Sequence, residues 1–157
     1  LEEREFDGII LARAGLVRLG LEDSITETLS TDVMLPAPGQ GAIAVEIRAD
    51  DALVRDLIRA LHDDATARCV TAERTALRVL EGGCHVPMGA LAVIKGSTMT
   101  IDAVVASPDG RDYIRRSVAS STCDPVELGV SVAEKLVSLG AREIMSKLAR
   151  AGTNRDA

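Results

Sequence analysis

The sequence predicts two fold classes in one chain: segments of a parallel α/β domain come first, and an α+β unit with a three-stranded antiparallel sheet and helices follows. A short apolar run at residues 6–12 is typical of a strand buried on both faces of a parallel sheet. Apolar and small residues then recur with the period of a helix over residues 65–80. Over residues 99–105 they alternate with polar residues, as in an antiparallel strand with one buried face.

The first part of the chain is expected to contain short elements. The strand at residues 6–12 precedes a helical turn over residues 14–19 that ends at a glycine. A second strand is expected over residues 42–47, and a helix capped by Asp50 and Asp51 follows it to about residue 61. Two short strands make a poor parallel sheet, so this part is interpreted as incomplete by itself.

Residues 35–41 have the sequence Leu-Pro-Ala-Pro-Gly-Gln-Gly. The prolines remove backbone donors and fix φ, and the glycines free the backbone, so the stretch is neither a helix nor a central strand. It is interpreted as a connector between two structural units. A simple turn at Gly39, Gln40 and Gly41 would explain the same residues.

The second part of the chain is predicted to begin with a long helix and a meander. The helix starts at Asp64 and ends at Gly82 and Gly83, and one of its faces carries Ala65, Cys69, Ala72, Ala76, Val79 and Leu80. Turns are expected at residues 95–97 and 108–110. The inner face of the meander carries Met99, Ile101, Ala103 and Val105.

Two helices are predicted to complete this part. Asp124 is a favoured cap and Pro125 a favoured first residue of a helix, one face of which carries Leu128, Val132, Leu136 and Leu139. A last helix follows Gly140 and spans residues 141–151.

Composition indicates a globular protein, because 46% of the residues are hydrophobic and 27% are charged. Residues 1–60 carry 12 acidic and 6 basic side chains, whereas residues 61–157 carry 12 of each. A nucleic-acid binder would show a basic excess instead. One Tyr, one Phe and no Trp also leave almost no platform for base stacking. No nucleic acid is therefore expected as a partner.

Neither export nor membrane insertion is expected. No run of about 18 apolar residues occurs, and the first five residues are acidic where a signal peptide would be basic. Three cysteines without close spacing argue against a disulfide framework and favour a reducing, cytoplasmic compartment. Because residue 1 is not Met, the chain is interpreted as an excised fragment, a processed product or the second part of something longer.

Residues 81–89, Glu-Gly-Gly-Cys-His-Val-Pro-Met-Gly, are the most informative segment. The glycines allow a close backbone approach to a ligand and Pro87 stiffens the exit, so Cys84 is expected on a shaped loop. Three other interpretations exist. Cys84 is a small buried hydrophobe after a helix cap, or it forms a nucleophilic pair with His85, or it binds zinc. Neighbouring side chains seldom reach each other, and no set of four zinc ligands has the usual spacing.

Several segments together resemble the porphobilinogen deaminase family. Residues 81–89, preceded at helical distance by residues 71–74 (Thr-Ala-Glu-Arg), resemble its cofactor-attachment segment. Residues 35–46 and 12–19 are similar to two further signatures, and the likeness continues through residues 107–110 and 140–144. The signatures occur in the family's order, so the resemblance covers essentially the whole chain. Met88, where the family often has Ile, is a mild apolar change.

The resemblance implies a three-domain fold, with two α/β domains similar to periplasmic binding proteins and a third α+β domain. Residues 1–40 would belong to the second domain, residues 41–61 would return to the first, and residues 62–157 would form the third, cofactor-anchoring domain. The family's N-terminal half, with its catalytic aspartate and most substrate-binding arginines, is not in this sequence. It is the expected partner, and the chain alone is expected to be inactive.

The activity implied by the resemblance is the condensation of four porphobilinogen molecules into hydroxymethylbilane with loss of ammonia. Cys84 would hold a dipyrromethane cofactor through a thioether, which resists the hydrolysis that frees the product. Each pyrrole carries an acetate and a propionate, so fixed guanidinium groups are needed around the growing chain. No metal and no membrane are implied.

Five more residues match the family's cofactor-binding positions: Ala12, Gly15, Arg18, Gln40 and Gly41. Arg18 matches a carboxylate-binding arginine, although a solvated helix residue would look the same. Arg13 departs from the small residue of many relatives. Two alternatives remain at this point: a non-catalytic interaction module, because helix, three strands and helix is similar to double-stranded RNA-binding architecture, and a Cys-His thiol hydrolase.

Overall fold

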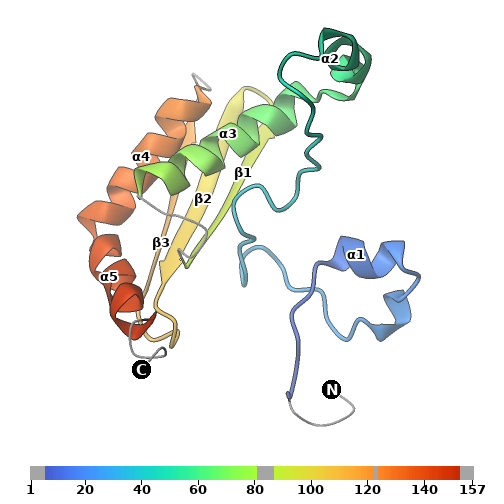
Figure 1. The fold of residues 1–157 in the computed structure, drawn as a ribbon. Coiled ribbons are helices and arrows are strands. Elements are labelled where there is room, and N and C mark those ends of the chain that lie inside the picture. Colours follow the sequence, from blue (N-terminus) through green and yellow to red (C-terminus); the bar gives the residue numbers. More distant parts are fainter. Residues whose placement is uncertain (1–5, 81–86, 122–123, 153–157) are drawn as a thin grey trace. The chain divides into compact units, whose positions relative to one another are not determined.

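The computed structural model describes residues 6–80, 87–121 and 124–152, with side chains described as far as Ser146 (Figure 1). The chain divides into two units, Leu1–Met34 and Leu35–Ala157, and each is described by itself. The predictions for Gly82, Gly83, Cys84, His85 and Cys123 lie outside the described residues.

The first unit contains two short helices. The α-helix α1 spans Arg13–Arg18 and the 3₁₀-helix η1 spans Glu22–Ser24. α1 ends where Gly20 adopts a left-handed backbone with φ of 71°, a conformation that glycine reaches without a Cβ clash. The helical turn predicted for residues 14–19 is therefore confirmed to within one residue.

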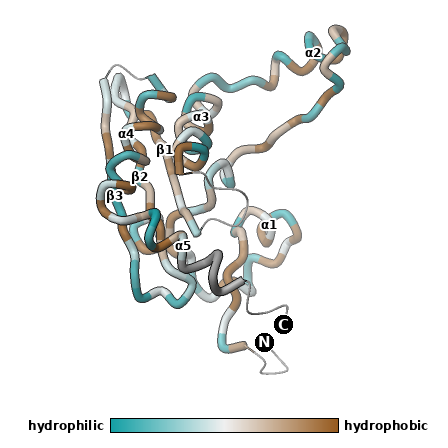
Figure 2. The backbone as a smooth tube through the Cα atoms, turned by 60° about the vertical axis from the view of Figure 1, so that its left-hand side comes forward, coloured by the Kyte–Doolittle hydropathy of each residue, from teal (hydrophilic) through white to brown (hydrophobic). Residues whose placement is uncertain are grey.

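The two strands predicted for the first part of the chain are wrong in this structure. Residues 6–12 and 42–47 are extended or turn-like, and neither segment pairs with another strand among the described residues. Their apolar side chains stay exposed: Ile10 is 67% exposed and Ile43 is 94% exposed. Figure 2 shows the hydrophobic stretch that leads into α1. An apolar run forms a buried strand only when neighbouring strands satisfy its backbone groups, and the described residues supply none.

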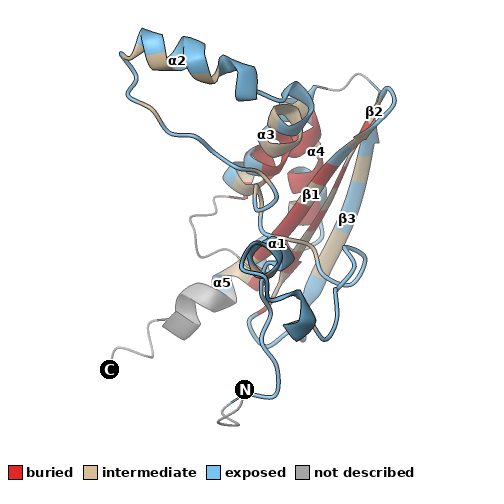
Figure 3. Ribbon diagram, turned by 90° about the vertical axis from the view of Figure 1, so that its right-hand side faces the viewer, coloured by how far each residue is buried: buried red, intermediate tan, exposed pale blue. Residues whose placement is uncertain are grey.

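The second unit opens with residues 35–51 and a helix. α2 spans Ala52–Ile58 and continues into the 3₁₀-helix η2 at Arg59–Leu61. The Asp51 side chain caps α2 by accepting a hydrogen bond of 3.0 Å from the Val54 N–H. The predicted helix and one of its two predicted capping residues are thus confirmed. No residue of α2 is buried (Figure 3).

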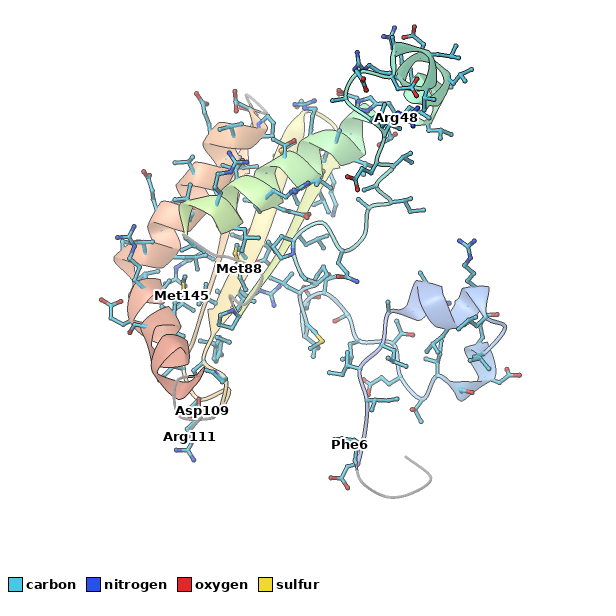
Figure 4. The ribbon with its side chains drawn as sticks, in the orientation of Figure 1. Phe6, Arg48, Met88, Asp109, Arg111 and Met145 are labelled. Atoms are coloured by element: carbon cyan, nitrogen blue, oxygen red, sulfur yellow. The ribbon has the colours of Figure 1, made fainter. Side chains whose placement is uncertain are left out.

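A three-stranded antiparallel sheet forms the centre of the second unit. β1 spans Met88–Lys95, β2 spans Thr98–Ala106 and β3 spans Tyr113–Ser120, in the order β1-β2-β3. Each strand pairs with the next along the chain, so the predicted meander is confirmed. Figure 4 shows Asp109 and Arg111 at the turn between β2 and β3, where they form an exposed ion pair of 3.7 Å.

Three helices pack against the sheet. α3 spans Asp64–Val79, α4 spans Pro125–Ser138 and α5 spans Ala141–Gly152. Asp63 caps α3, and Asp124 caps α4 with Pro125 in the first turn, as the sequence predicts for α4. α3 and α4 lie side by side on one face of the sheet (Figures 1 and 3).

The core lies between these helices and the sheet, and most of the predicted inward positions are part of it. Met99, Ile101, Ala103 and Val105 alternate with half-buried residues along β2, as predicted. The helices contribute Ala72, Ala76, Leu80, Leu128, Val132, Ala133, Leu136, Ala141 and Ile144. Two predicted core positions are wrong, because Leu139 is 45% exposed at the end of α4 and Ala65 is exposed in the first turn of α3.

Candidate functional site

Three predicted cofactor-binding residues lie on or next to one short helix of the first unit. Ala12 is the residue before α1, and its carbonyl accepts a hydrogen bond of 3.0 Å from the Gly15 N–H. Arg18 ends the helix and is exposed. Spacings of three residues place Ala12, Gly15 and Arg18 along one side of the helix. The structure therefore brings these three predicted residues together.

On this side of α1 the backbone at Gly15 is open to a ligand. A Cβ atom built on Gly15 would meet no atom within 4 Å outside its own helix and chain neighbours. A flat group can therefore approach the peptide units at Gly15 closely, while the Arg18 guanidinium supplies a permanent positive charge one turn away. This combination fits a ligand that has flat rings and carboxylates.

Gln40 and Gly41 lie in a turn of the second unit. The Gln40 N–H donates to the Ala37 carbonyl at 3.0 Å, and the Ala42 N–H donates to the Gly39 carbonyl at 3.2 Å. Gly39 has φ of 77°, which favours glycine. Residues 35–41 form neither helix nor strand, as predicted, and both Gln40 and Gly41 are exposed.

This connector, residues 35–41, is attached to the outer edge of β1. The Ala90 N–H donates to the Pro36 carbonyl at 2.8 Å. At Gly89 the approach is so close that an added Cβ would lie 2.9 Å from the Leu35 Cβ and 3.0 Å from the Leu35 carbonyl oxygen. Gly89 is thus needed because the connector leaves no room for a side chain.

Glu73 is a functional candidate that sequence reasoning missed. It lies on α3, is 5% exposed, and accepts two backbone hydrogen bonds with its two carboxylate oxygens. The Gly39 N–H donates to Oε2 at 2.7 Å, and the Ala92 N–H donates to Oε1 at 2.8 Å. The helical period did not identify it, because a charged residue next to Ala72 is normally assigned to a solvated face. Its place within residues 71–74, which resemble a family signature, was the available signal.

Of Cys69 and Cys84, only Cys69 lies among the described residues. Cys84 lies outside the described residues, in the segment that joins the end of α3 to the start of β1. Cys69 is half-buried on α3 and packs against the core, as predicted. Burial raises the pKa of the Cys69 thiol above its ordinary value, and the nearby Glu73 carboxylate raises it further. A thiol with a raised pKa is a weak nucleophile, so Cys69 is not a candidate for covalent attachment.

A cavity of about 650 Å³ lies elsewhere in the second unit. Its walls are residues 42–45, the end of α2 with η2, and the first turns of α3, and its polar lining residues are Arg55, Arg59, His62, Asp63 and Thr66. None of the predicted site residues lines it. The walls include Ile43 and Val45, which are exposed members of the predicted strand.

Two further kinds of feature were sought among the described residues: a metal-binding group of side chains and a membrane-spanning helix. No three His, Cys, Asp or Glu side chains in the described ranges are grouped to hold a metal ion. Among the same residues, no helix is long and apolar enough to cross a membrane.

Comparisons with known proteins agree on one family. Residues 1–56 match the family model "Porphobilinogen deaminase, dipyromethane cofactor binding domain", and residues 67–138 match "Porphobilinogen deaminase, C-terminal domain". The chain is 47% identical over 150 residues to a porphobilinogen deaminase of Carboxydothermus hydrogenoformans, covering 96% of this chain and 48% of that protein. It is 48% identical over 151 residues to one of Acidithiobacillus ferrooxidans, covering 96% of this chain and 49% of that protein.

A third relative, the porphobilinogen deaminase of Exiguobacterium, is 45% identical over 149 residues, which are 94% of this chain and 48% of that protein. The chain thus spans about half the length of the curated relatives that it matches. The two family models match successive parts of the chain, and the relatives match nearly all of it. The chain belongs to the porphobilinogen deaminase family.

Proposed function

We propose that this chain is the cofactor-bearing C-terminal portion of a hydroxymethylbilane synthase, and that Cys84 anchors a dipyrromethane. The enzyme condenses four porphobilinogen molecules into hydroxymethylbilane with release of ammonia, a step of tetrapyrrole biosynthesis in the cytoplasm. The observation that carries the proposal is the match of both family models in order along the chain, with Cys84 inside the second one. The domain assignment 1–40, 41–61 and 62–157, with α/β parts similar to periplasmic binding proteins, belongs to this proposal.

The described residues fit such a cofactor. Ala12, Gly15 and Arg18 share one side of α1, where the backbone at Gly15 is open and the guanidinium is exposed. We assign Arg18 to a cofactor carboxylate, because guanidinium binds carboxylate in a bidentate manner and keeps its charge at every physiological pH. We assign Gln40 and Gly41 of the connector to cofactor binding as well, because both are exposed. When bound, the dipyrromethane supplies a covalent primer to which pyrrole units are added.

Cys84 suits the anchoring role by its chemistry and its place in the chain. A thiolate is a strong nucleophile toward carbon, and the thioether that it forms survives the final hydrolysis. The anchor segment lies between α3 and β1 in the sequence, and both of these elements contribute to the packed core. Cys69 cannot replace it, since its thiol is half-buried and has a raised pKa.

The rest of the cleft is assigned to the enzyme's N-terminal half. The catalytic aspartate and most carboxylate-binding arginines of the family have no counterpart among these 157 residues. Exposed apolar side chains support a missing partner: Phe6, Ile9, Ile10, Leu11, Ile43, Val45, Leu53, Leu57 and Leu61 are all more than half exposed. A soluble protein rarely leaves so many large apolar groups in water, and a partner surface would cover them.

Intact-mass spectrometry after incubation with the N-terminal half and porphobilinogen tests the proposal. We expect a mass increase equal to one dipyrromethane, located on Cys84 by peptide mapping, and a pink colour with an aldehyde reagent for pyrroles. A thiol hydrolase or an interaction module gives neither signal. An unmodified Cys84 under these conditions would contradict the proposed function.

A further inference from the structure

Glu73 is buried in the second unit, and the proposed chemistry gives it no part. A carboxylate at 5% exposure has lost most of its hydration, and this loss must be offset by hydrogen bonds. Both of its oxygens have a donor: the Gly39 N–H lies at 2.7 Å from one, and the Ala92 N–H lies at 2.8 Å from the other. Backbone N–H groups that donate to a carboxylate make short, strong hydrogen bonds. Each carboxylate oxygen of Glu73 therefore has a hydrogen-bond donor.

These two bonds join three elements that are distant in sequence. Glu73 belongs to α3, Ala92 to β1 and Gly39 to the connector, which is 34 residues away from Glu73. A further bond from the Ala90 N–H to the Pro36 carbonyl holds the connector on the same edge of β1. The connector is thus bonded at both ends of residues 36–39, through Pro36 to β1 and through Gly39 to α3.

We infer that Glu73 is a positioning residue, whose carboxylate fixes the connector and β1 to α3. α3 and β1 flank the Cys84 segment in the sequence, and one side chain thus connects these two elements and residue 39. Gln40 and Gly41 follow residue 39 directly in the sequence. Only the importance for a cofactor rests on the proposed function; the attachment of the connector does not.

The geometry requires a carboxylate and not only a polar side chain of this size. Gln has the same shape, but it offers one acceptor oxygen and an NH₂ group that donates. In Glu73→Gln one of the two N–H groups would face another donor, and its hydrogen bond would be lost. The connector would then be released locally while the apolar core keeps its packing.

Amide resonances of the isotope-labelled full chain provide the test. In Glu73→Gln we expect the Gly39 or the Ala92 N–H to shift upfield and to exchange with solvent about tenfold faster or more. The amides of Ile101 and Val105 in the core should keep their exchange rates. Glu134→Gln is the matched control, because it makes the same change at an exposed position of α4 and should alter none of these signals.

Unchanged signals of Gly39 and Ala92 in Glu73→Gln would overturn the inference. Equal acceleration at Ile101 and Val105 would also overturn it, since Glu73 would then act on global stability alone. If Glu73→Gln does not fold, Gly39→Ala replaces it, because a Cβ at φ of 77° is strained and leaves α3 and β1 intact. In Gly39→Ala the amide at position 39 should exchange with solvent faster than in the unaltered chain, and the amide of Ala92 should keep its exchange rate. An unchanged exchange rate at position 39 contradicts the inference.

A second measurement separates this inference from the proposed function. With the N-terminal half and porphobilinogen present, Glu73→Gln should load Cys84 more slowly than Glu134→Gln. Failure of the unaltered chain to load would count against the proposed function and leave the amide result untouched. Normal loading by Glu73→Gln, with Gly39 released, would show that the connector's position has no effect on the cofactor and would overturn the positioning role.

Discussion

Gly129 of α4 lies directly against the carbonyl group of Ala72 on α3. A Cβ atom built on Gly129 would overlap that oxygen, and it would lie 2.8 Å from the Thr75 Cβ and 3.1 Å from the Ala76 nitrogen. The two helices can approach so closely because Gly129 has no side chain. This contact fixes the distance between the two helices that cover the sheet.

The substitution Gly129→Ala should therefore destabilise the second unit. The clash is with backbone atoms, which cannot move aside as a flexible side chain can, so we expect a loss of about 1–3 kcal/mol in the free energy of unfolding. Urea denaturation followed by circular dichroism measures it. Gly41→Ala is the control, because its Cβ would meet nothing within 4 Å. Equal midpoints for the two variants would show that the helices can separate at no cost.

Replacing Cys84 by serine should abolish cofactor loading in the complete enzyme. A hydroxyl is far less ionised than a thiol near neutral pH, so the serine variant would present almost no nucleophile. Intact mass after incubation with porphobilinogen checks this. Cys123→Ala serves as the comparison and should load normally with nearly intact turnover. A dipyrromethane retained by the serine variant, or loading lost in a folded Cys123→Ala protein, would refute the assignment of the anchor.

Cys69 should react slowly with alkylating reagents and contribute to a loss of stability at high pH. Burial and then the Glu73 carboxylate raise its pKa above that of an unhindered thiol, so the folded state keeps its proton to a higher pH than the unfolded state does. The stabilising contribution is fully present below the pKa of the unfolded thiol and is lost as the pH rises through the higher pKa of the folded state. Unfolding free energies measured across this range should fall less steeply in Cys69→Ala. Equal slopes would mean that the thiol ionises freely in the folded chain.

The chain by itself should not consume porphobilinogen. Condensation needs a positioned acid or base and several arginines around the carboxylates, and these groups work only when both walls of the cleft are present. Residues 1–60 carry twice as many acidic as basic side chains and would repel a polycarboxylate. Porphobilinogen consumption is measured with this chain, with the N-terminal half and with both together. Turnover by this chain alone would disprove the prediction, whereas activity on mixing confirms it.

The sequence predicted the elements whose partners are also in the sequence. Ile101 and Val105 alternate along a strand that pairs with its chain neighbours on both sides, so local pattern and tertiary structure agree. Ile43 also lies in an apolar run, but no neighbouring strand is available among the described residues, and it is 94% exposed. Periodicity identifies which side chains could be buried; burial itself depends on a surface elsewhere.

The candidate site shows the same division. Helical spacing places Ala12, Gly15 and Arg18 on one side of α1, and this relation follows from residue numbers alone. The hydrogen bonds of Glu73 cannot be predicted from residue numbers. Its partners are 34 and 19 residues away, and they are backbone N–H groups, which carry no sequence signal. A buried charge with two backbone partners is visible only when the chain has been folded.

The connector also protects the sheet from pairing with other molecules. β1 is an edge strand, and such an edge exposes a row of N–H and C=O groups that a strand of a second chain can extend. Here the outward N–H groups of Ala90 and Ala92 are already bonded, one to Pro36 and the other to Glu73. Without these two bonds, both N–H groups would be open to pairing with a strand of another chain. The connector and Glu73 thus together occupy two positions at which a foreign strand could be added along this edge.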